Sequence, residues 1–393
     1  MRDSGTSSIV NIDRSRLPDG YTDTMTSPRR RNHVTLRDIA RAADVSYQTV
    51  SLVVNDKPGV SQETRKRVRK LIAELDYRPN HVARMLSTNR SRMLELFLVD
   101  VSYGGRLADT VKNMANAAKR NGYSLLVSET DAEGLAAAVE SARSRLVDGV
   151  VLYAPRLTMD DDELRARFGD LPVLRRDFVP GSRLPWVGFD QVHATRLALE
   201  HLIDLGHTRI AAIAPEVGIL NGHWRTTSFR TVLLEHGLTP AHMVWGDYSI
   251  GSGYDAAKEL LAASETFTAV VIGTDNMALG AMHAVREAGL RVPDDLSVVS
   301  YDNTEFAAYL EPPLTTVDFS FGQQDEVAVN YLLELLESPD AAVHQRVLTP
   351  SLVVRKSAGP PRAGPPRASP PRAGAPRAGT PAVDVSRGTT ERG

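Results

Sequence analysis

Three polar side chains lie close together at the start of one short helical stretch, and their chemistry suits the reading of DNA bases. Tyr47, Gln48 and Ser51 fall on one face of a helix because helical neighbours recur every three to four residues. Hydroxyl and amide groups hydrogen-bond to base edges in a major groove, which is about 12 Å wide and admits one helix. A small helical hairpin that binds no DNA is the alternative that the spacing leaves open.

A preceding helix and a tight corner position this stretch. The preceding segment has an apolar face at helical spacing, formed by Leu36, Ile39, Ala40 and Ala43. The stretch itself has an apolar inner face, formed by Val50, Val53 and Val54. Between them, Asp44 and Val45 form a corner, and Ser46 is a favourable N-cap for the second helix. The pattern predicts a helix-turn-helix, in which the second helix enters the groove.

A third helix over residues 61–75 completes a small domain. Ser61 caps it, and its inward face is formed by Val68, Leu71, Ile72 and Leu75. Residues 34–92 resemble the DNA-binding headpiece and hinge of the LacI/GalR family of bacterial transcription regulators. The segments that carry the resemblance are Thr35–Ala40, Val45–Ser51 and Tyr77–Asn80. The resemblance implies a sequence-specific transcriptional regulator, most simply a repressor, whose partner is double-stranded operator DNA.

The resemblance also assigns DNA contacts to individual residues. Tyr47, Gln48 and Ser51 would face the major groove. Contacts to phosphates, or support for such contacts, are implied for Thr35, Ser46, Thr49, Asn55, Ser61, Thr64, Tyr77 and Asn80. Leu52 stands where most relatives carry an arginine that pairs with guanine, and leucine offers only apolar contact, for example with a thymine methyl. We therefore expect a half-site that differs from the common family sequence.

The segment after the headpiece has two interpretations. Residues 80–87 form a short amphipathic stretch. In the family such a stretch is a hinge helix that folds on the operator, and Leu86 would then wedge open a base step in the minor groove. Eight helical residues are marginal alone, so an ordinary linker is the second interpretation.

Short apolar strands alternate with helices from about Met93 onward. The strands are expected at residues 94–101, 124–127, 149–153, 185–189, 209–213, 269–272 and 297–301. This alternation is typical of βαβ units on parallel sheets, and its return later in the chain predicts two α/β lobes. The resemblance implies a body like a periplasmic sugar-binding protein, with three crossings between lobes. We place them near residues 153–156, 301–310 and 316–319.

Charged side chains at strand ends predict a ligand site between the lobes. Asp275, Asp302 and Asp190 each follow an expected strand, Arg225 matches the family's ligand-binding arginine, and Tyr248 could supply an aromatic platform. Open α/β sheets bind ligands at the carboxyl ends of their strands. Carboxylates and a guanidinium suit a sugar or a related polyol because they bond to adjacent hydroxyls. Helix capping is the alternative role for the carboxylates.

Composition limits the function further. The 393 residues suit two or three domains and contain no cysteine, which excludes disulfides, zinc fingers and thiol catalysis. No apolar run is long enough for a membrane span and no signal peptide opens the chain, so we expect a cytoplasmic protein without membrane partners. Residues 29–92 hold fifteen Lys/Arg against six Asp/Glu, whereas residues 93–354 hold twenty against thirty-six. A basic module on an acidic body suits DNA binding by the module alone.

Enzymatic chemistry finds little support in the sequence. There is no nucleophile elbow, no phosphate-binding glycine loop and no zinc spacing, so we expect neither catalysis nor a cofactor or metal. We interpret His207 as a scaffold histidine because it follows a helix end. A solute-binding protein and a small-molecule enzyme that uses the α/β cleft stay as alternatives.

The predicted domains follow from these features. Residues 1–32 are a disordered extension, in which Met25 is a second possible start; residues 33–79 are the headpiece, 80–92 the hinge helix and linker, 93–356 the two-lobed body. Residues 357–393 form a tail rich in Pro, Arg, Ala and Gly, and it contains no leucine heptad. We expect a homodimer of an α/β protein with an all-α headpiece.

Overall fold

The computed structural model describes residues 34–54, 58–75, 77, 90–101, 106–216, 218–264, 266–338 and 342–362. The chain divides into two compact units, residues 1–84 and residues 85–393. The predicted N-terminal extension, the hinge with Asn80 and Leu86, the contact residue Asn55 and the tail from residue 363 lie outside the described residues.

Three helices form the headpiece. They are α1 (Leu36–Ala42), α2 (Tyr47–Val54) and α3 (Gln62–Glu74). The core between them consists of Ile39, Ala40, Ala43, Val50, Val53 and Val68, which confirms the predicted inner faces. The prediction was wrong for Leu75, which is 38% exposed. Leu75 is the C-cap residue that follows the end of α3 at Glu74.

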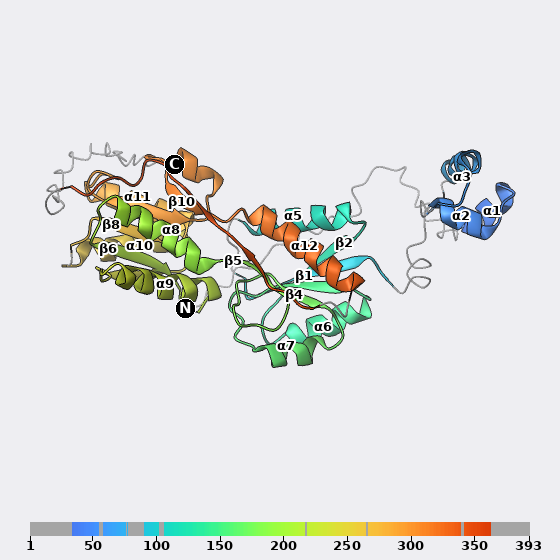
Figure 1. Ribbon diagram of the computed structural model, residues 1–393, viewed down its shortest axis with the longest axis horizontal. Helices are drawn as coiled ribbons and strands as arrows, with labels where there is room; N and C mark the ends of the chain where they lie inside the picture. The colour runs from blue at the N-terminus through green and yellow to red at the C-terminus, as the bar shows by residue number, and fades with distance from the viewer. Residues whose placement is uncertain are drawn as a thin grey trace, which may run out of the picture. The chain divides into compact units, whose positions relative to one another are not determined.

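The first lobe of the body is a parallel sheet between two pairs of helices. Its elements are β1 (Met93–Val99), α5 (Leu107–Arg120), β2 (Ser124–Thr130), α6 (Leu135–Ser144), β3 (Gly149–Tyr153), α7 (Asp161–Phe168) and β4 (Val173–Arg175). The strand order is β2-β1-β3-β4. Helix α12 (Phe321–Glu337) joins α5 on one face, and α6 and α7 cover the other (Figure 1).

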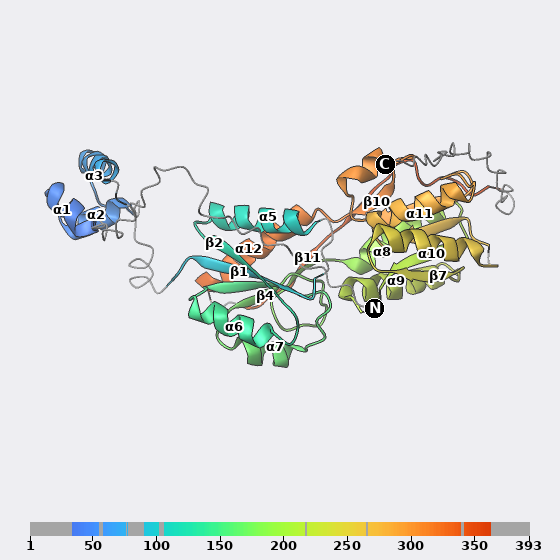
Figure 2. The same cartoon turned by 180° about the vertical axis from the view of Figure 1, so that it is seen from behind.

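The second lobe repeats this plan. Its elements are α8 (Gln191–Asp204), β6 (Ile210–Pro215), α9 (Leu220–Glu235), β7 (Met243–Gly246), α10 (Ile250–Ala262), β8 (Ala269–Ile272), α11 (Asp275–Glu287), β9 (Ser297–Tyr301), the 3-10 helix η2 (Glu305–Tyr309), β10 (Thr315–Asp318) and β12 (Ser351–Val353). The sheet order is β12-β10-β9-β8-β6-β7, with β12 antiparallel to β10. Helices α8 and α9 pack on one face, and α10 and α11 on the other (Figure 2).

The chain passes between the lobes at three places, of which one was predicted correctly. Strand β5 (Val187–Phe189) pairs with β11 (Arg346–Leu348), and the chain crosses after β5, between β10 and α12, and between β11 and β12. The crossing between β10 and α12 confirms the prediction near residues 316–319. The predictions near residues 153–156 and 301–310 were wrong, because β4 still pairs with β3 and β10 with β9 after those segments.

The body extends past residue 356, where we placed the start of the tail. Ser357 is fully buried, and its hydroxyl donates to the Val298 carbonyl at 2.6 Å and accepts from the Thr315 amide at 2.8 Å. A serine has too little apolar surface to predict burial, so no local pattern indicated that Ser357 anchors the chain. Among the described helices, none is long and apolar enough to cross a membrane.

Candidate functional site

Helix α2 presents the predicted base-reading side chains at the headpiece surface. Tyr47 is 52% exposed, Gln48 is also exposed, and Ser51 is partly buried one turn further on. Ser46 precedes the helix and caps it, because its hydroxyl accepts a hydrogen bond from the Thr49 amide at 3.0 Å. Because Val50 and Val53 are buried on the opposite face of α2, its polar face is free to enter a DNA groove.

The residues expected at phosphates have local structural roles of their own. Thr35 caps α1 and exchanges hydrogen bonds with Asp38, and Ser61 caps α3 by accepting from the Thr64 amide at 3.2 Å. Tyr77 packs against the headpiece core. Leu52 is partly buried and follows Gln48 by one helical turn. These local roles neither require nor exclude contacts with DNA, so the DNA contacts of these residues stay predictions.

Arg225 is the centre of the polar site at the junction of the two lobes. It extends from α9, is 5% exposed, and donates from Nε to Gln191 Oε1 at 2.9 Å. Its guanidinium lies 4.5 Å from the ring centroid of Tyr301 and 5.0 Å from that of Phe319. Its Nη2 atom lies 3.8 Å from Asp302 Oδ1, a distance that leaves this nitrogen available to a ligand.

Asp302 occupies the turn after β9. Its φ of 109° is a strained conformation for a residue with a side chain, as is common at functional sites. Burial raises the pKa of its carboxyl to about 7; Arg225 opposes the shift and Asp275 adds to it. The backbone carbonyl of Asp302 accepts from Arg106 Nη1 at 3.2 Å, and Arg106 belongs to the first lobe. Residues of both lobes therefore influence the protonation state of the Asp302 carboxyl.

Asp275 lies behind this site. It is fully buried, and its carboxylate accepts hydrogen bonds from Ser300, Thr304 and Thr316. The Thr304 amide also donates to it, at 2.6 Å. With these lone pairs occupied, Asp275 holds the turn that carries Asp302, a role that its place after a strand did not reveal.

The other two predicted ligand residues differ in their surroundings. Asp190 caps α8 by accepting from the His193 amide at 2.9 Å, which is the alternative role that the sequence left open. Tyr248 has a φ of 74°, and its hydroxyl is buried without a hydrogen-bond partner. Burial raises the pKa of Tyr248, while the nearby Arg225 lowers it. A buried, unpartnered hydroxyl beside Arg225 suits a ligand contact.

Two further residues at this junction were missed by sequence reasoning. Arg106 precedes α5, and its Nε is buried and unpartnered. Asp177 follows β4 and is 3% exposed: Oδ2 accepts from the Ala154 amide at 3.2 Å and Oδ1 has no partner. Burial raises the pKa of Asp177 to about 6. The charged run from Arg175 to Asp177 between apolar residues was an available sign, but β4 itself was not predicted.

His207 is part of the scaffold, as predicted. It is 1% exposed, with Nδ1 2.8 Å from Thr268 Oγ1 and Nε2 2.9 Å from the Gly359 carbonyl oxygen. Burial lowers its pKa. Among the described residues no group of histidine or acidic side chains could hold a metal ion.

Comparison with known proteins agrees with this architecture. Residues 35–80 match the model of bacterial regulatory proteins of the lacI family, and residues 199–358 match a periplasmic binding protein-like domain. The chain is 33% identical to the transcriptional repressor PurR of Haemophilus influenzae (strain PittEE), over 82% of this chain and 98% of that protein. It is also 33% identical to the lactose operon repressor of Escherichia coli K12, over 82% and 90%.

A solved structure gives the same result. The lac repressor dimer bound to operator and the anti-inducer ONPF superposes with a TM-score of 0.73 at 33% identity, covering 83% of this chain and 99% of that one. Each of these matches covers more than four fifths of this chain and at least 90% of the relative. The chain therefore belongs to the LacI family of bacterial regulatory proteins.

Proposed function

We propose that the protein is an operator-binding transcriptional repressor whose DNA affinity is controlled by a small ligand between the two lobes. The observation that carries this proposal is the polar face of α2, where Tyr47 and Gln48 are exposed on a LacI-type headpiece. Its relatives are named as repressors, and one is solved on its operator.

Selection of binding sites from random DNA tests the DNA-binding part. The full-length chain should enrich a two-fold symmetric site, and the double variant Tyr47→Ala/Gln48→Ala should lose most of that preference because each good base contact discriminates by about 1–3 kcal/mol. The matched control is Lys70→Ala/Glu74→Ala, which removes an exposed ion pair of α3 without changing net charge. Full operator preference in the Tyr47/Gln48 variant would refute the assignment.

The ligand site is proposed around Arg225, Asp302 and Tyr248, with Arg106 and Asp177 added from the first lobe. Three of these residues bury an unpartnered polar atom: Arg106 Nε, Asp177 Oδ1 and Tyr248 Oη. Each such atom costs about 1–3 kcal/mol until it finds a partner. Because the set contains both donors and acceptors, a sugar or related polyol would pair with it better than a ligand with acceptors alone. We assign positioning roles to Asp275, which holds the turn that carries Asp302, and to Asp190, which caps α8.

Thermal-shift screening of the full-length chain against sugars, polyols and nucleosides tests this site. A ligand at 100 times its Kd stabilises the folded state by about 2.7 kcal/mol. We expect Arg225→Met to abolish the shift produced by the hit. Arg230→Met, an exposed arginine of the same helix, is the control and should retain it.

Control of DNA binding would follow from closure of the lobes. Arg106 and Arg156 of the first lobe already contact Asp302 and Glu216 of the second, at 3.2 Å and 2.9 Å. A ligand that prefers one arrangement of the lobes shifts the population towards it, and the predicted hinge at residues 80–87 would pass this change to the headpiece. Either induction or corepression requires only that the ligand discriminates between the two states.

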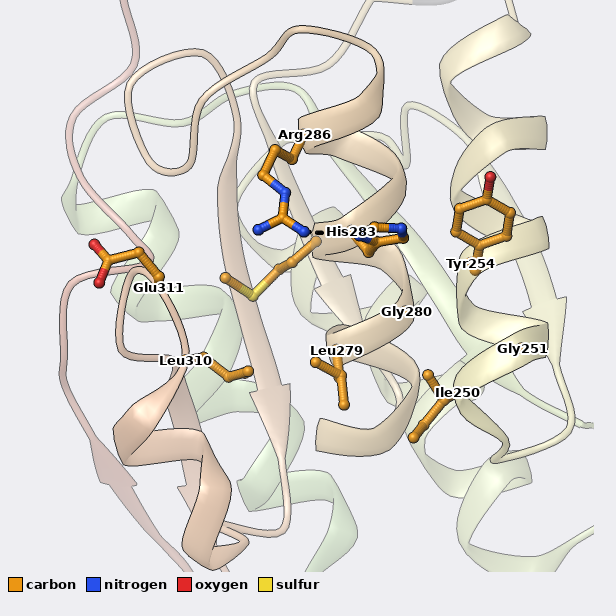
Figure 3. A pocket seen from close by; sticks show the side chains of 10 residues that line it. Ile250, Gly251, Tyr254, Leu279, Gly280, His283, Arg286, Leu310 and Glu311 are labelled. Atoms are coloured by element: carbon orange, nitrogen blue, oxygen red, sulfur yellow. Dashed lines mark hydrogen bonds between the residues drawn. The ribbon is translucent and has the colours of Figure 1, made fainter. Parts of the chain in front are cut away.

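We propose that the protein is a homodimer and that the second lobe carries part of the interface. A groove of about 510 Å³ lies between α10, α11 and the segment after η2 (Figure 3). Ile250, Leu279 and Leu310 give it an apolar floor, and next to it Tyr309 is 83% exposed. A solved relative is a dimer. Ile250→Asp should therefore yield monomers in analytical ultracentrifugation, and a dimer of unchanged affinity would contradict this placement.

A further inference from the structure

The groove on the second lobe carries opposite charges on its two walls. Arg286 extends from α11, and Glu311 from the segment that follows η2 (Figure 3). Both side chains are exposed. No ion pair joins them within the described part of one chain, although both line the same groove.

Arg286 is held by a neighbour that does not neutralise it. Its Nη2 donates to His283 Nδ1 at 2.8 Å, so His283 acts as an acceptor (Figure 3). The nearby carboxylate of Glu287 accepts a hydrogen bond from the Tyr254 hydroxyl at 2.6 Å and lies 3.5 Å from His283 Nε2. The guanidinium of Arg286 is therefore positioned at the groove with its charge available to a second anion.

Glu311 is the complementary group. Within the described residues its carboxylate has neither a hydrogen bond nor an ion pair. The residue before it, Leu310, packs against the core of the lobe, which fixes the place where Glu311 leaves the chain. An anion and a cation on one groove form a self-complementary surface when a two-fold axis passes between them, because each then faces the other in a second copy.

We propose that Arg286 of one copy pairs with Glu311 of a second copy across this groove, and that this pair restricts dimerisation to copies of this chain. The inference rests on the proposed dimer, and it adds the source of partner selectivity. Two-fold symmetry forms the contact twice. An exposed pair contributes little affinity, but a like-charge pair at an interface is strongly unfavourable, so the pair selects against other partners more than it strengthens the correct dimer.

Charge reversal in the full-length chain tests the pairing. Arg286→Glu alone and Glu311→Arg alone each place like charges together twice, and each should weaken the homodimer by at least about tenfold. The two variants mixed should form a heterodimer in preference to either homodimer, because every contact is then attractive. The double variant Arg286→Glu/Glu311→Arg should form a homodimer again. Native mass spectrometry of differently tagged chains measures all four.

Two controls separate this proposal from the dimer on which it rests. Arg230→Glu makes the same charge change on α9, which packs on the other face of the sheet, and it should leave dimerisation unchanged. If Ile250→Asp is monomeric but the mixed charge variants show no preference for each other, the pairing is refuted while the interface stands. If Ile250→Asp stays dimeric, the groove is not the interface and both proposals fail.

Discussion

Asp302 carries a carboxyl group whose charge is set by residues from both lobes. Its folded-state pKa of about 7 lies above the ordinary value of 3.8, so the folded protein binds more protons than the unfolded chain between about pH 4 and pH 7. Stability contributed by this group is present at acidic pH and is lost as the pH rises through that window. The ionised carboxylate can accept a hydrogen bond from a ligand hydroxyl.

The substitution Asp302→Asn should remove this pH dependence of the stability. The free energy of unfolding of the variant, relative to the original chain, should increase between pH 4 and pH 7 by on the order of 2–4 kcal/mol. Denaturant titrations at several pH values measure the difference. Asp255→Asn, an exposed aspartate on α10, is the control and should show a nearly constant difference. A pH-independent difference for Asp302→Asn would contradict the assigned pKa.

The proposed DNA contacts predict that Leu52 limits which bases α2 reads one turn beyond Gln48. Leucine has no donor for guanine, so the site selected by the unmodified chain should lack a strong guanine requirement at the base pair opposite residue 52. Leu52→Arg should introduce one, with discrimination of about 1–3 kcal/mol. Parallel selections from random DNA compare the two proteins. An identical guanine preference in both would show that this residue does not face a base.

Individual side chains explain why the sequence predicted the site only in part. Arg225, Asp302 and Tyr248 stay in the proposed ligand site, and the sequence indicated them through a matching arginine and through polar residues that follow strands. Asp275 satisfied the same pattern, yet its hydrogen bonds to Ser300, Thr304 and Thr316 turn its carboxylate into the interior. Contacts between segments distant in sequence decide which way a carboxylate points, and no local pattern encodes them.

At the scale of elements, a buried ion pair ties three parts of the first lobe together. Arg176 follows β4, and its Nε donates to Asp325 of α12 at 2.7 Å; Asn113 of α5 donates to the same carboxylate at 3.1 Å. Arg176 is 4% exposed and Asp325 is fully buried. The pair lies beside Tyr153, whose ring centroid is 4.9 Å from the Arg176 guanidinium.

Breaking one side of this pair leaves a buried charge alone. Asp325→Leu should lower the free energy of unfolding by about 3–5 kcal/mol, whereas Arg176→Met/Asp325→Leu should recover most of that loss because it removes both charges. Chemical denaturation of the four members of this double-mutant cycle measures the coupling. Additive effects of the two single changes would contradict a direct pair.

Element length explains where the fold could be predicted. Strands β3, β8 and β9 were placed correctly because each is an uninterrupted apolar run with clear boundaries. Strands β4 and β11 have three residues each, too few for periodicity to identify, whereas the strand predicted at residues 185–189 contains β5. Two of the three crossings were misplaced because a crossing depends on which strands pair, and pairing is not visible in the local pattern of a single strand. The headpiece was predicted well because its caps and corner are local in sequence.

At the scale of the whole molecule, the chain combines a basic reading module with an acidic, ligand-binding body. The headpiece and its flanks carry fifteen Lys/Arg against six Asp/Glu, whereas residues 93–354 carry twenty against thirty-six. Phosphate attraction is thus confined to the module, and its contribution falls as salt rises. Control of DNA binding then depends on coupling between the lobe junction and the headpiece.

Titration of the selected operator with the full-length protein, with and without the ligand found by thermal shift, tests this coupling most directly. Coupling free energies are typically 1–3 kcal/mol, so the ligand should change operator affinity by about 5- to 150-fold. Arg225→Met should bind the same operator with unchanged ligand-free affinity and should not respond to the ligand. Failure to select any operator, or an operator affinity that stays the same when the bound ligand saturates the protein, would contradict the account.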